Sequence, residues 1–508
     1  MHINKLYKDL LIFDIIILGD SMKDKIKLKH IHIGIIILGS LFLLLPIFHE
    51  SLWFDEAYSV GLANHNFIDI WTIGGHDVHP ILYYFFLHTI YLIFRSKSII
   101  IYRLFSWLCF TLLGIIGYTH IKKDFNEKVG LIFSFLVYFL PVSGLYSGEI
   151  RMYALGMLLG TLMSIHAYRI YKNDIKKSTL PIFGLCSLAL AYTHYYGLML
   201  AGIINLALFI YLIKEKRQKD LKKFIIIAII QVILYIPWLI FFVTQLKGVS
   251  SGFWINITFP GTLYEILTVQ YLGKLSMNLM VVLTIIFYIY LGYLIAKNKK
   301  DMKIPLMAIV IYLSIIVSAL LVSLIMWSAI LYYRYMLIIT GLLIFALSFI
   351  LSKGNKYVVA CILLCIFLLS SYSMKINIEE AYDEFNDDHI NYVLENIKDN
   401  DIIIYSDMSA TALTTRLYQN RDIVSYFYNK DNWGIHEAYK AFEPYMYVAD
   451  DLESILDNYH GRIWIVESNT NELQDKLIEE YGVKPIEYKE FYQKYKSLPY
   501  TIELVEKR

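Results

Sequence analysis

Residues 31–60 read IHIGIIILGSLFLLLPIFHESLWFDEAYSV, so a long apolar run stands directly before two adjacent carboxylates. As a helix, the run 31–48 covers about 27 Å, close to the roughly 30 Å of hydrocarbon in a bilayer. Asp55 and Glu56 follow within a short aromatic sequence. This order predicts a membrane-spanning helix that leads into a polar loop at the membrane surface.

The rest of the chain has the same apolar character. Of its 508 residues, 57% are hydrophobic and only 18% are charged, whereas soluble proteins carry about 25% charged residues. The mean hydropathy is +0.51. These values exclude fibrous, disulfide-stapled, disordered and nucleic-acid-binding classes, and they indicate an all-α polytopic membrane protein.

Eleven stretches are long and apolar enough to predict membrane-spanning helices. They are 31–48, 99–121, 129–147, 152–170, 179–196, 197–213, 224–244, 277–296, 304–326, 330–351 and 357–374. A further stretch, 79–94, would reach only about 24 Å as a helix. We expect it to lie along the outer face as a juxtamembrane helix.

The distribution of Lys and Arg predicts the orientation. With a cytoplasmic N-terminus and 79–94 on the surface, the cytoplasmic loops hold 23 Lys/Arg and the opposite loops hold six. If 79–94 crossed the membrane, every later loop would change sides and this asymmetry would be lost. We therefore expect a multi-pass plasma-membrane protein whose C-terminal end is extracytoplasmic.

Charge also marks the domain boundary. Residues 375–508 carry 14 Lys/Arg and 27 Asp/Glu, a net charge of −13, and the residues before them hold +15. We expect a cytoplasmic segment 1–30, in which Met22 is an alternative first residue, and a catalytic membrane domain 31–374 whose outer loop 49–98 carries the acidic pair. Residues 375–508 would form a small extracytoplasmic α/β domain of unassigned role. Its predicted strands are Ile402–Tyr405, Ile423–Phe427 and Ile463–Val466, and its predicted helices are 389–397, 408–419 and 472–481.

Ionisable residues gather where the predicted helices meet the outer face. In Trp53-Phe54-Asp55-Glu56-Ala57-Tyr58, a carboxylate desolvated between aromatic rings would have a raised pKa and serve as a general base. The alternative is a solvated helix cap. In His76-Asp77-Val78-His79-Pro80, the histidines would bind a phosphate or a metal, or lie in an ordinary loop, and their spacing lacks the helical His pair of a zinc site.

A third cluster, Gly148-Glu149-Ile150-Arg151-Met152-Tyr153, lies at a predicted turn between two spans. The planar fork of Arg151 matches phosphate oxygens, although a Glu–Arg pair that ties the turn together is the alternative. Arg103, His194 and Arg334 are further outer-face candidates, and Arg334 could equally reach toward lipid headgroups. The four cysteines all lie within predicted spans, without the partners of a metal or redox site, so we interpret them as packing residues.

Four motifs follow one another in the first part of the chain: WFDEAY at 53–58, HPILYY at 79–84, YRL at 102–104 and YSGEIRMYAL at 146–155. Their order resembles the family 39-like glycosyltransferases of the GT-C superfamily, which include protein O-mannosyltransferases and the aminoarabinose transferases that modify lipid A. The resemblance covers about 20–350, and Ile81 departs from it because many members have a second proline there.

The resemblance implies a GT-C fold and an enzyme that moves a sugar, with inversion, from a polyprenyl-phosphate carrier to an acceptor hydroxyl at the outer face. It implies Asp55 as the general base and Glu56 as the neighbour that orients the base or the acceptor. The substrate-binding residues that it implies are Arg151, Arg103 and His79 or Arg334 for the phosphate, Tyr153 and His194 for the sugar pocket, and Glu149.

The implied partners are the polyprenyl-linked donor, a cell-surface glycan, lipid or protein acceptor, and the bilayer, without nucleic acid. No cofactor is expected and no metal motif is evident, although some relatives in the superfamily use a divalent ion. Two other classes stay open: a lipid or solute transporter, which would carry charges near mid-membrane in paired broken helices, and a non-catalytic envelope scaffold.

Overall fold

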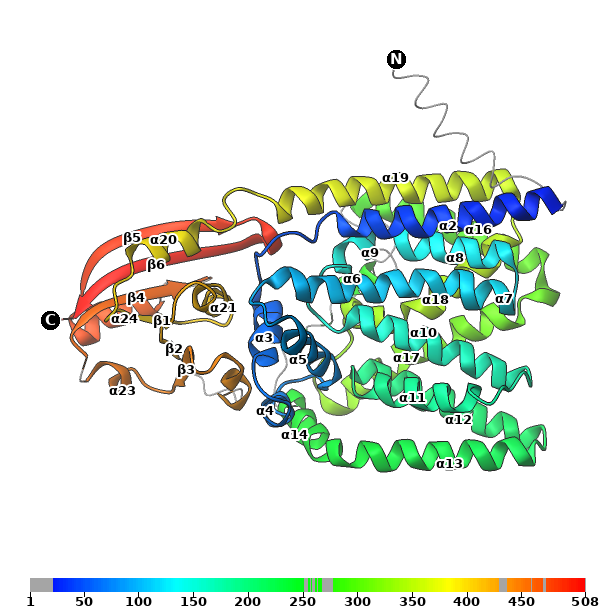
Figure 1. The fold of residues 1–508 in the computed structure, drawn as a ribbon, viewed down its shortest axis with the longest axis horizontal. Coiled ribbons are helices and arrows are strands. Elements are labelled where there is room, and N and C mark those ends of the chain that lie inside the picture. Colours follow the sequence, from blue (N-terminus) through cyan, green and yellow to red (C-terminus); the bar gives the residue numbers. More distant parts are fainter. Residues whose placement is uncertain are drawn as a thin grey trace, which may run out of the picture.

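Long apolar helices lie side by side in a bundle, and a sheet domain stands at one end of it, as a computed structural model of the chain shows (Figure 1). The structure describes residues 22–250, 255, 257, 261–262, 264–266, 277–428, 436–457, 459–468 and 472–507. Residues 1–21, which bear on the start of the chain, and much of the predicted outer segment 245–276 lie outside this part.

The bundle is built from helices that match the predicted spans in position. They are α2 (Met22–Leu44), α6 (Ile99–Ile116), α8 (Glu127–Phe139), α10 (Tyr153–Tyr171), α11 (Thr179–Ala191), α12 (Tyr195–Lys214), α13 (Gln218–Tyr235), α16 (Met277–Lys297), α17 (Lys303–Met326), α18 (Thr340–Ser352) and α19 (Lys356–Ala381). Large apolar side chains on α13, α16 and α17 are exposed, among them Ile229, Ile289 and Leu324. Such a surface is suited to lipid rather than to water.

The chain is a multi-pass membrane protein. Six helices in the described part are long and apolar enough to cross a bilayer, and four further apolar helices are shorter. The expected count of eleven crossings therefore stays a prediction.

Prolines interrupt two of the predicted spans. The span expected at 129–147 divides into α8 and the short α9 (Pro141–Tyr146), and the span expected at 224–244 turns at η2 (Ile236–Trp238) before α14 (Leu239–Ser250). Proline lacks the N–H that an inner helix position needs and clashes with the preceding turn, so each helix restarts there.

Glycines allow three helices to approach closely around Tyr138 of α8. This side chain is fully buried, and its hydroxyl donates to the carbonyl of Thr111 at 2.9 Å. A Cβ atom on Gly39 of α2 or on Gly114 of α6 would come within 2.4 Å or 2.1 Å of Tyr138 atoms. The ring therefore fills the space that these two glycines leave open.

Three short helices lie between the bundle and the sheet domain: α3 (Phe54–Ala63), α4 (Phe67–Gly74) and α5 (Leu82–Phe94) (Figure 1). α3 is buried from Glu56 to Ala63. α5 corresponds to the stretch expected to lie at the membrane surface, and its Phe94 end remains exposed. The sheet domain packs against these helices.

The predicted C-terminal α/β domain is confirmed, with six strands in the order β3-β2-β1-β4-β6-β5. β1 (Ile402–Tyr405) pairs in parallel with β2 (Ser425–Tyr428) and β4 (Gly461–Glu467), and β2 pairs in parallel with β3 (Met446–Ala449). The predicted helices correspond to α20 (Asp388–Asn396), α21 (Ala412–Tyr418) and α24 (Glu472–Tyr481), and the remaining short helices are α22 (His436–Tyr439), η5 (Lys440–Phe442) and α23 (Glu453–Leu456).

β3 and the antiparallel pair β5 (Lys484–Gln493) and β6 (Leu498–Lys507) were not predicted from the sequence. β5 is exposed along almost its whole length, so it lacks the alternating apolar pattern that indicates a strand. The turn η6 (Tyr495–Ser497) joins the two strands and reaches the end of the bundle (Figure 1).

Gly114→Ala should lower the thermal unfolding midpoint of the purified protein. The added methyl would overlap the Tyr138 ring, and overpacking of this kind costs about 1–3 kcal/mol. Gly34→Ala on α2 is the control, because no atom lies within 4 Å of its Cβ position and alanine favours a helix. Equal midpoints for the two variants would contradict the proposed packing of α2, α6 and α8.

Candidate active site

A buried ion pair lies where α3 meets the bundle. Arg103 Nη1 donates to Glu56 Oε1 at 2.6 Å and Nη2 donates to Oε2 at 3.1 Å. The exposed fractions of the two side chains are 1% and 0%. A two-pronged contact of this kind is the strong geometry for an arginine–carboxylate pair.

The remaining hydrogen-bonding groups of both side chains also have partners. Glu56 accepts from the backbone N–H of Ile150 and from the hydroxyl of Tyr495, both at 3.1 Å. Arg103 donates to the carbonyls of Ser51 (2.6 Å), Gly148 (3.0 Å) and His49 (3.3 Å). The pair thus joins the outer loop, the turn before α10 and the sheet domain. The orienting role expected for Glu56 and the phosphate-binding role expected for Arg103 stay predictions.

Asp55, one position earlier in α3, faces a different environment. Its side chain is 19% exposed, and its Oδ2 lies 3.2 Å from Arg334 Nη2 and 3.8 Å from Arg151 Nε. Adjacent residues in a helix point about 100° apart, so one carboxylate can be buried while its neighbour stays partly exposed. Asp55 is therefore the reachable carboxylate of the pair.

Arg151 lies behind Asp55 and is almost fully buried. Its Nη1 lies 3.3 Å from the hydroxyl of Tyr84 and 3.4 Å from the hydroxyl of Ser59. Tyr84 in turn donates to Asp77 Oδ2 at 3.1 Å. Burial raises the pKa of Asp77, and the charge of Arg151 opposes that rise.

Arg334, in η4 (Tyr333–Ile339), connects Asp55 with a second acidic residue. Its guanidinium lies 5.0 Å from the Trp53 ring centroid and 5.7 Å from that of Tyr153. Its Nη1 lies 4.0 Å from Glu149 Oε1. The aromatic faces stabilise the cation from the sides while two carboxylates face it.

Glu149 has a partner that sequence analysis did not identify. Its Oε2 lies 3.2 Å from the Nζ of Lys496, which comes from η6 of the sheet domain. Glu149 itself is buried, with a side-chain exposure of 1%. The sheet domain therefore contributes a charged side chain to the same cluster.

Two neutral histidines lie at the border of the cluster. The rings of His79 and His194 are 4.9 Å apart, and the Tyr335 ring packs against both. Burial lowers the pKa of His79 well below its ordinary value, with smaller effects from His194 and the two arginines, and burial followed by Arg151 and Arg334 lowers the pKa of His194 to about 3.

Several polar atoms of this cluster are buried and have no hydrogen-bond partner within the described part of the chain. Such atoms are rare in folded proteins and call for an explanation such as a bound ligand or water. They are His79 Nδ1, Glu149 Oε1, Arg151 Nε, Tyr153 Oη, His194 Nε2 and Arg334 Nε. The cluster has the polar capacity to hold an anionic, hydroxyl-rich ligand.

The structure brings all nine predicted site residues to one end of the bundle. Asp55, Glu149, Arg151, Tyr153 and Arg334 contact one another directly or through one neighbour. Glu56 and Arg103 lie behind them as a separate pair. Asp77, Tyr84, Tyr495 and Lys496 were not predicted as site residues. Asp77 and Tyr84 stand within quoted motifs, whereas no sequence signal pointed to the other two.

Across the described residues, no three His, Cys, Asp or Glu side chains converge as metal ligands. The expectation that no cofactor is needed stays untested.

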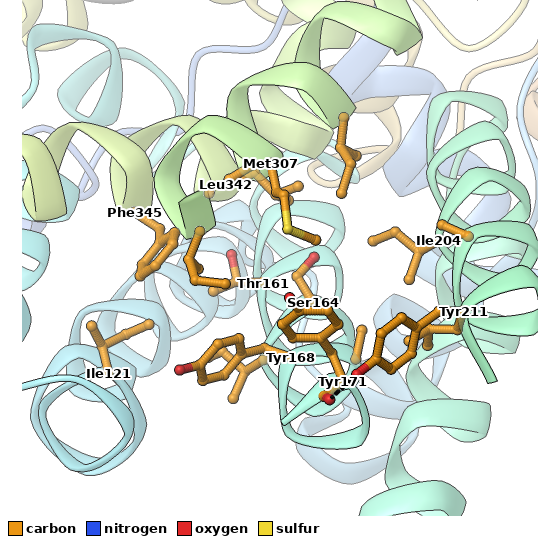
Figure 2. A pocket seen from close by; sticks show the side chains of 18 of the residues that line it. Ile121, Thr161, Ser164, Tyr168, Tyr171, Ile204, Tyr211, Met307, Leu342 and Phe345 are labelled. Atoms are coloured by element: carbon orange, nitrogen blue, oxygen red, sulfur yellow. Dashed lines mark hydrogen bonds between the residues drawn. The ribbon is translucent and has the colours of Figure 1, made fainter. Parts of the chain in front are cut away.

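A separate pocket of about 380 Å³ lies between α10, α12, α17 and α18 (Figure 2). Its lining is apolar apart from a few hydroxyl groups and a lysine. Labelled in the close-up are Ile121, Thr161, Ser164, Tyr168, Tyr171, Ile204, Tyr211, Met307, Leu342 and Phe345.

No protein-family model and no curated protein matches the chain. Solved structures do. The apo crystal structure of ArnT from Cupriavidus metallidurans aligns with a TM-score of 0.60 at 10% identity, covering 93% of this chain and 97% of that one. The crystal structure of the same protein bound to undecaprenyl phosphate aligns with a TM-score of 0.56 at 11% identity, covering 92% and 97%. At this identity the likeness concerns the fold, and it confirms the predicted GT-C fold.

Glu56→Gln should destabilise the protein strongly. The change keeps the side-chain size but leaves the buried Arg103 without its counter-charge, and breaking such a pair costs about 3–5 kcal/mol. The measurement is the thermal unfolding midpoint in detergent. Glu50→Gln is the control, because Glu50 is 37% exposed and lies 3.6 Å from Arg416, so its loss should cost under about 1 kcal/mol. Similar midpoints for both variants would contradict the expected large contribution of the buried pair to stability.

Proposed function

We propose that the chain is an inverting membrane glycosyltransferase that transfers a sugar from a polyprenyl-phosphate carrier to an acceptor hydroxyl. The observation that carries the proposal is the position of Asp55, partly open and flanked by Arg151 and Arg334 at the membrane end of the bundle. The GT-C fold supports it, as does the fact that ArnT, which shares this fold, has been crystallised with undecaprenyl phosphate.

The chemistry requires a base and a cationic site. The acceptor oxygen forms a bond to the anomeric carbon as the bond from that carbon to the phosphate oxygen breaks. The acceptor proton passes to Asp55, and the electron pair leaves with the lipid phosphate. A phosphate leaving group needs cations to hold its charge rather than an acid to protonate it. Arg151 and Arg334 are the cations closest to the base, and we assign them to the phosphate.

The buried polar atoms next to the base would serve the sugar. Tyr153 Oη, His79 Nδ1 and His194 Nε2 have no hydrogen-bond partner within the described ranges. The neutral state of the histidines lets each ring donate one hydrogen bond and accept another, which suits sugar hydroxyls. Because Asp55 is 19% exposed, an acceptor can approach the base from outside the bundle.

The apolar pocket of Figure 2 offers room for part of the carrier's hydrocarbon tail. α10 runs from Tyr153 in the polar cluster to Tyr171 in the pocket, a distance of about 27 Å along the helix. One helix therefore connects a phosphate site with an apolar site deeper in the bundle. A long isoprenoid chain between α10, α12 and their neighbours would link the two.

We place this reaction on the extracytoplasmic side of the plasma membrane, because the Lys-rich loops lie at the other end of the bundle. The acceptor would then be a cell-surface glycan, lipid or protein, and the sheet domain 375–508 would face it. The charged cluster lies at one end of the helices rather than near mid-membrane in two matching halves, which favours an enzyme over a transporter.

Asp55→Asn should reduce sugar transfer in proteoliposomes by at least about 10²-fold, as expected when a general base is lost. The donor is a labelled polyprenyl-phosphate hexose, and cell-envelope extract supplies the acceptor. Binding of undecaprenyl phosphate should persist in Asp55→Asn and weaken in Arg151→Ala. Asp69→Asn on α4, where the carboxylate accepts from Nδ2 of the nearby Asn66 at 2.6 Å, is the matched control and should keep wild-type transfer.

Normal turnover by Asp55→Asn would remove the assigned base. Movement of the intact carrier across the bilayer by wild type, without cleavage, would replace the enzyme with a transporter. Because arginines supply the positive charge in this proposal, we expect transfer to continue in excess chelator. Loss of transfer that a divalent ion restores would contradict that expectation.

A further inference from the structure

The turn η6 holds an unusual backbone conformation next to the polar cluster. Lys496 and Ser497 have φ angles of 61° and 56°, so two successive non-glycine residues occupy the left-handed region. Such a conformation is unfavourable for residues with a side chain and persists only where surrounding contacts enforce it. Residues held in this way gather at functional sites, and the contacts around η6 show what the conformation achieves.

Hydrogen bonds fix the approach to this turn. Asn386 Oδ1 accepts from the backbone N–H groups of Lys494 (2.9 Å) and Tyr495 (3.1 Å). Gln493 Nε2 donates to the carbonyl of Leu52 at 3.0 Å, which ties β5 to the loop before α3. The hydroxyl of Tyr495 donates to Glu56. Together these contacts attach the sheet domain to the bundle without using the Lys496 side chain.

The ammonium group of Lys496 points into the cluster. It lies 3.2 Å from Glu149 Oε2, 5.3 Å from the Trp53 ring centroid and 5.9 Å from that of Tyr146. The side chain is 30% exposed, so the ammonium is enclosed but still reachable. Burial acts to lower the pKa of Lys496, but Glu149, Tyr495 and Glu56 outweigh it and raise that pKa, which keeps the group charged.

Arg334 approaches the same two groups. Its guanidinium lies 5.0 Å from the Trp53 centroid and 4.0 Å from Glu149. Two cations thus share one aromatic ring and one carboxylate, and Arg334 is shared again with Asp55. Like charges held this close repel each other, and an anion between them would relieve the repulsion. Arg151, Arg334 and Lys496 face Asp55 and Glu149, and Arg151 also interacts with Asp77, which accepts a hydrogen bond from Tyr84.

We infer that Lys496 is the third cation of the phosphate site and that it contacts the phosphate of the polyprenyl carrier. The inference rests on the proposed function and deepens it, because it makes the sheet domain a part of the active site. In this interpretation, the strained turn directs the side chain of Lys496 back toward the membrane. Transfer then requires the sheet domain to be docked on α3 and the bundle.

The experiment compares the full-length protein with Lys496→Met and Lys496→Arg. Lys496→Met keeps most of the stem that packs against the rings and removes the charge. Loss of one charged contact to phosphate should weaken binding of undecaprenyl phosphate, and raise its carrier KM in transfer, by about 10- to 100-fold. Lys496→Arg should recover most of the affinity, because the charge returns. Lys494→Met is the matched control, since that neighbouring lysine is 47% exposed and pairs with Asp383 on the outside.

Inorganic phosphate is tested as a competitor of the labelled lipid, which separates recognition of the phosphate from recognition of the tail. We expect competition in wild type and much weaker competition in Lys496→Met. Unchanged lipid affinity and KM in Lys496→Met, with Asp55→Asn inactive, would overturn the role of Lys496 and leave the proposed function standing. An equal loss of lipid affinity in Lys494→Met would also overturn it. Lysine-dependent binding of the lipid phosphate without any transfer by wild type would instead contradict the proposed function alone.

Discussion

The buried pair of Glu56 and Arg103 is the interaction on which the other features of this site depend. It places two opposite charges out of water, where only close geometry and full hydrogen bonding offset the cost of desolvation. Each partner also binds backbone or side-chain groups from other segments, including Ile150 and Tyr495. The first outer loop, the start of α6, the turn before α10 and the sheet domain therefore meet at one point. Removing either charge would weaken the contacts among all of these segments.

This pair also gives two adjacent carboxylates different roles. Because Glu56 is turned inward and neutralised by Arg103, Asp55 is left as the carboxylate that a substrate can reach. The same backbone that buries one acid presents the other to Arg151 and Arg334. A helix start can supply this division without any special loop, since one step along the helix changes the direction of the side chain by about 100°. Under the proposed function, one of two neighbouring positions stabilises the structure and the other takes part in the chemistry.

Local patterns predicted much of this architecture, and contacts between distant residues account for what they missed. The apolar runs located the bundle helices, and the helix predicted over 472–481 is found as α24. The motifs around Asp55, His79 and Arg151 converge because each lies at or just before the start of a helix, and these helix starts lie at the same end of the bundle. Arg103 was predicted at the correct end of the bundle. Its N–H groups donate to backbone carbonyls, however, and no sequence pattern reveals these contacts. Lys496 lies 347 positions from Glu149, on a turn that follows β5, a strand whose exposed surface carries little apolar signal.

The distance along the chain between those two residues has a physical consequence. The side chains of η6 complete the polar cluster, and they lie far from α3 along the sequence. The cluster is therefore complete only when the sheet domain has folded and docked. Tyr495 reaches Glu56 and Lys496 reaches Glu149 from a single turn, which couples the buried pair to the reachable cations. A change at Glu56 should therefore act on the phosphate site without contact with the substrate, by releasing η6. Under the proposed function, the buried pair governs affinity for the carrier as well as the stability of the fold.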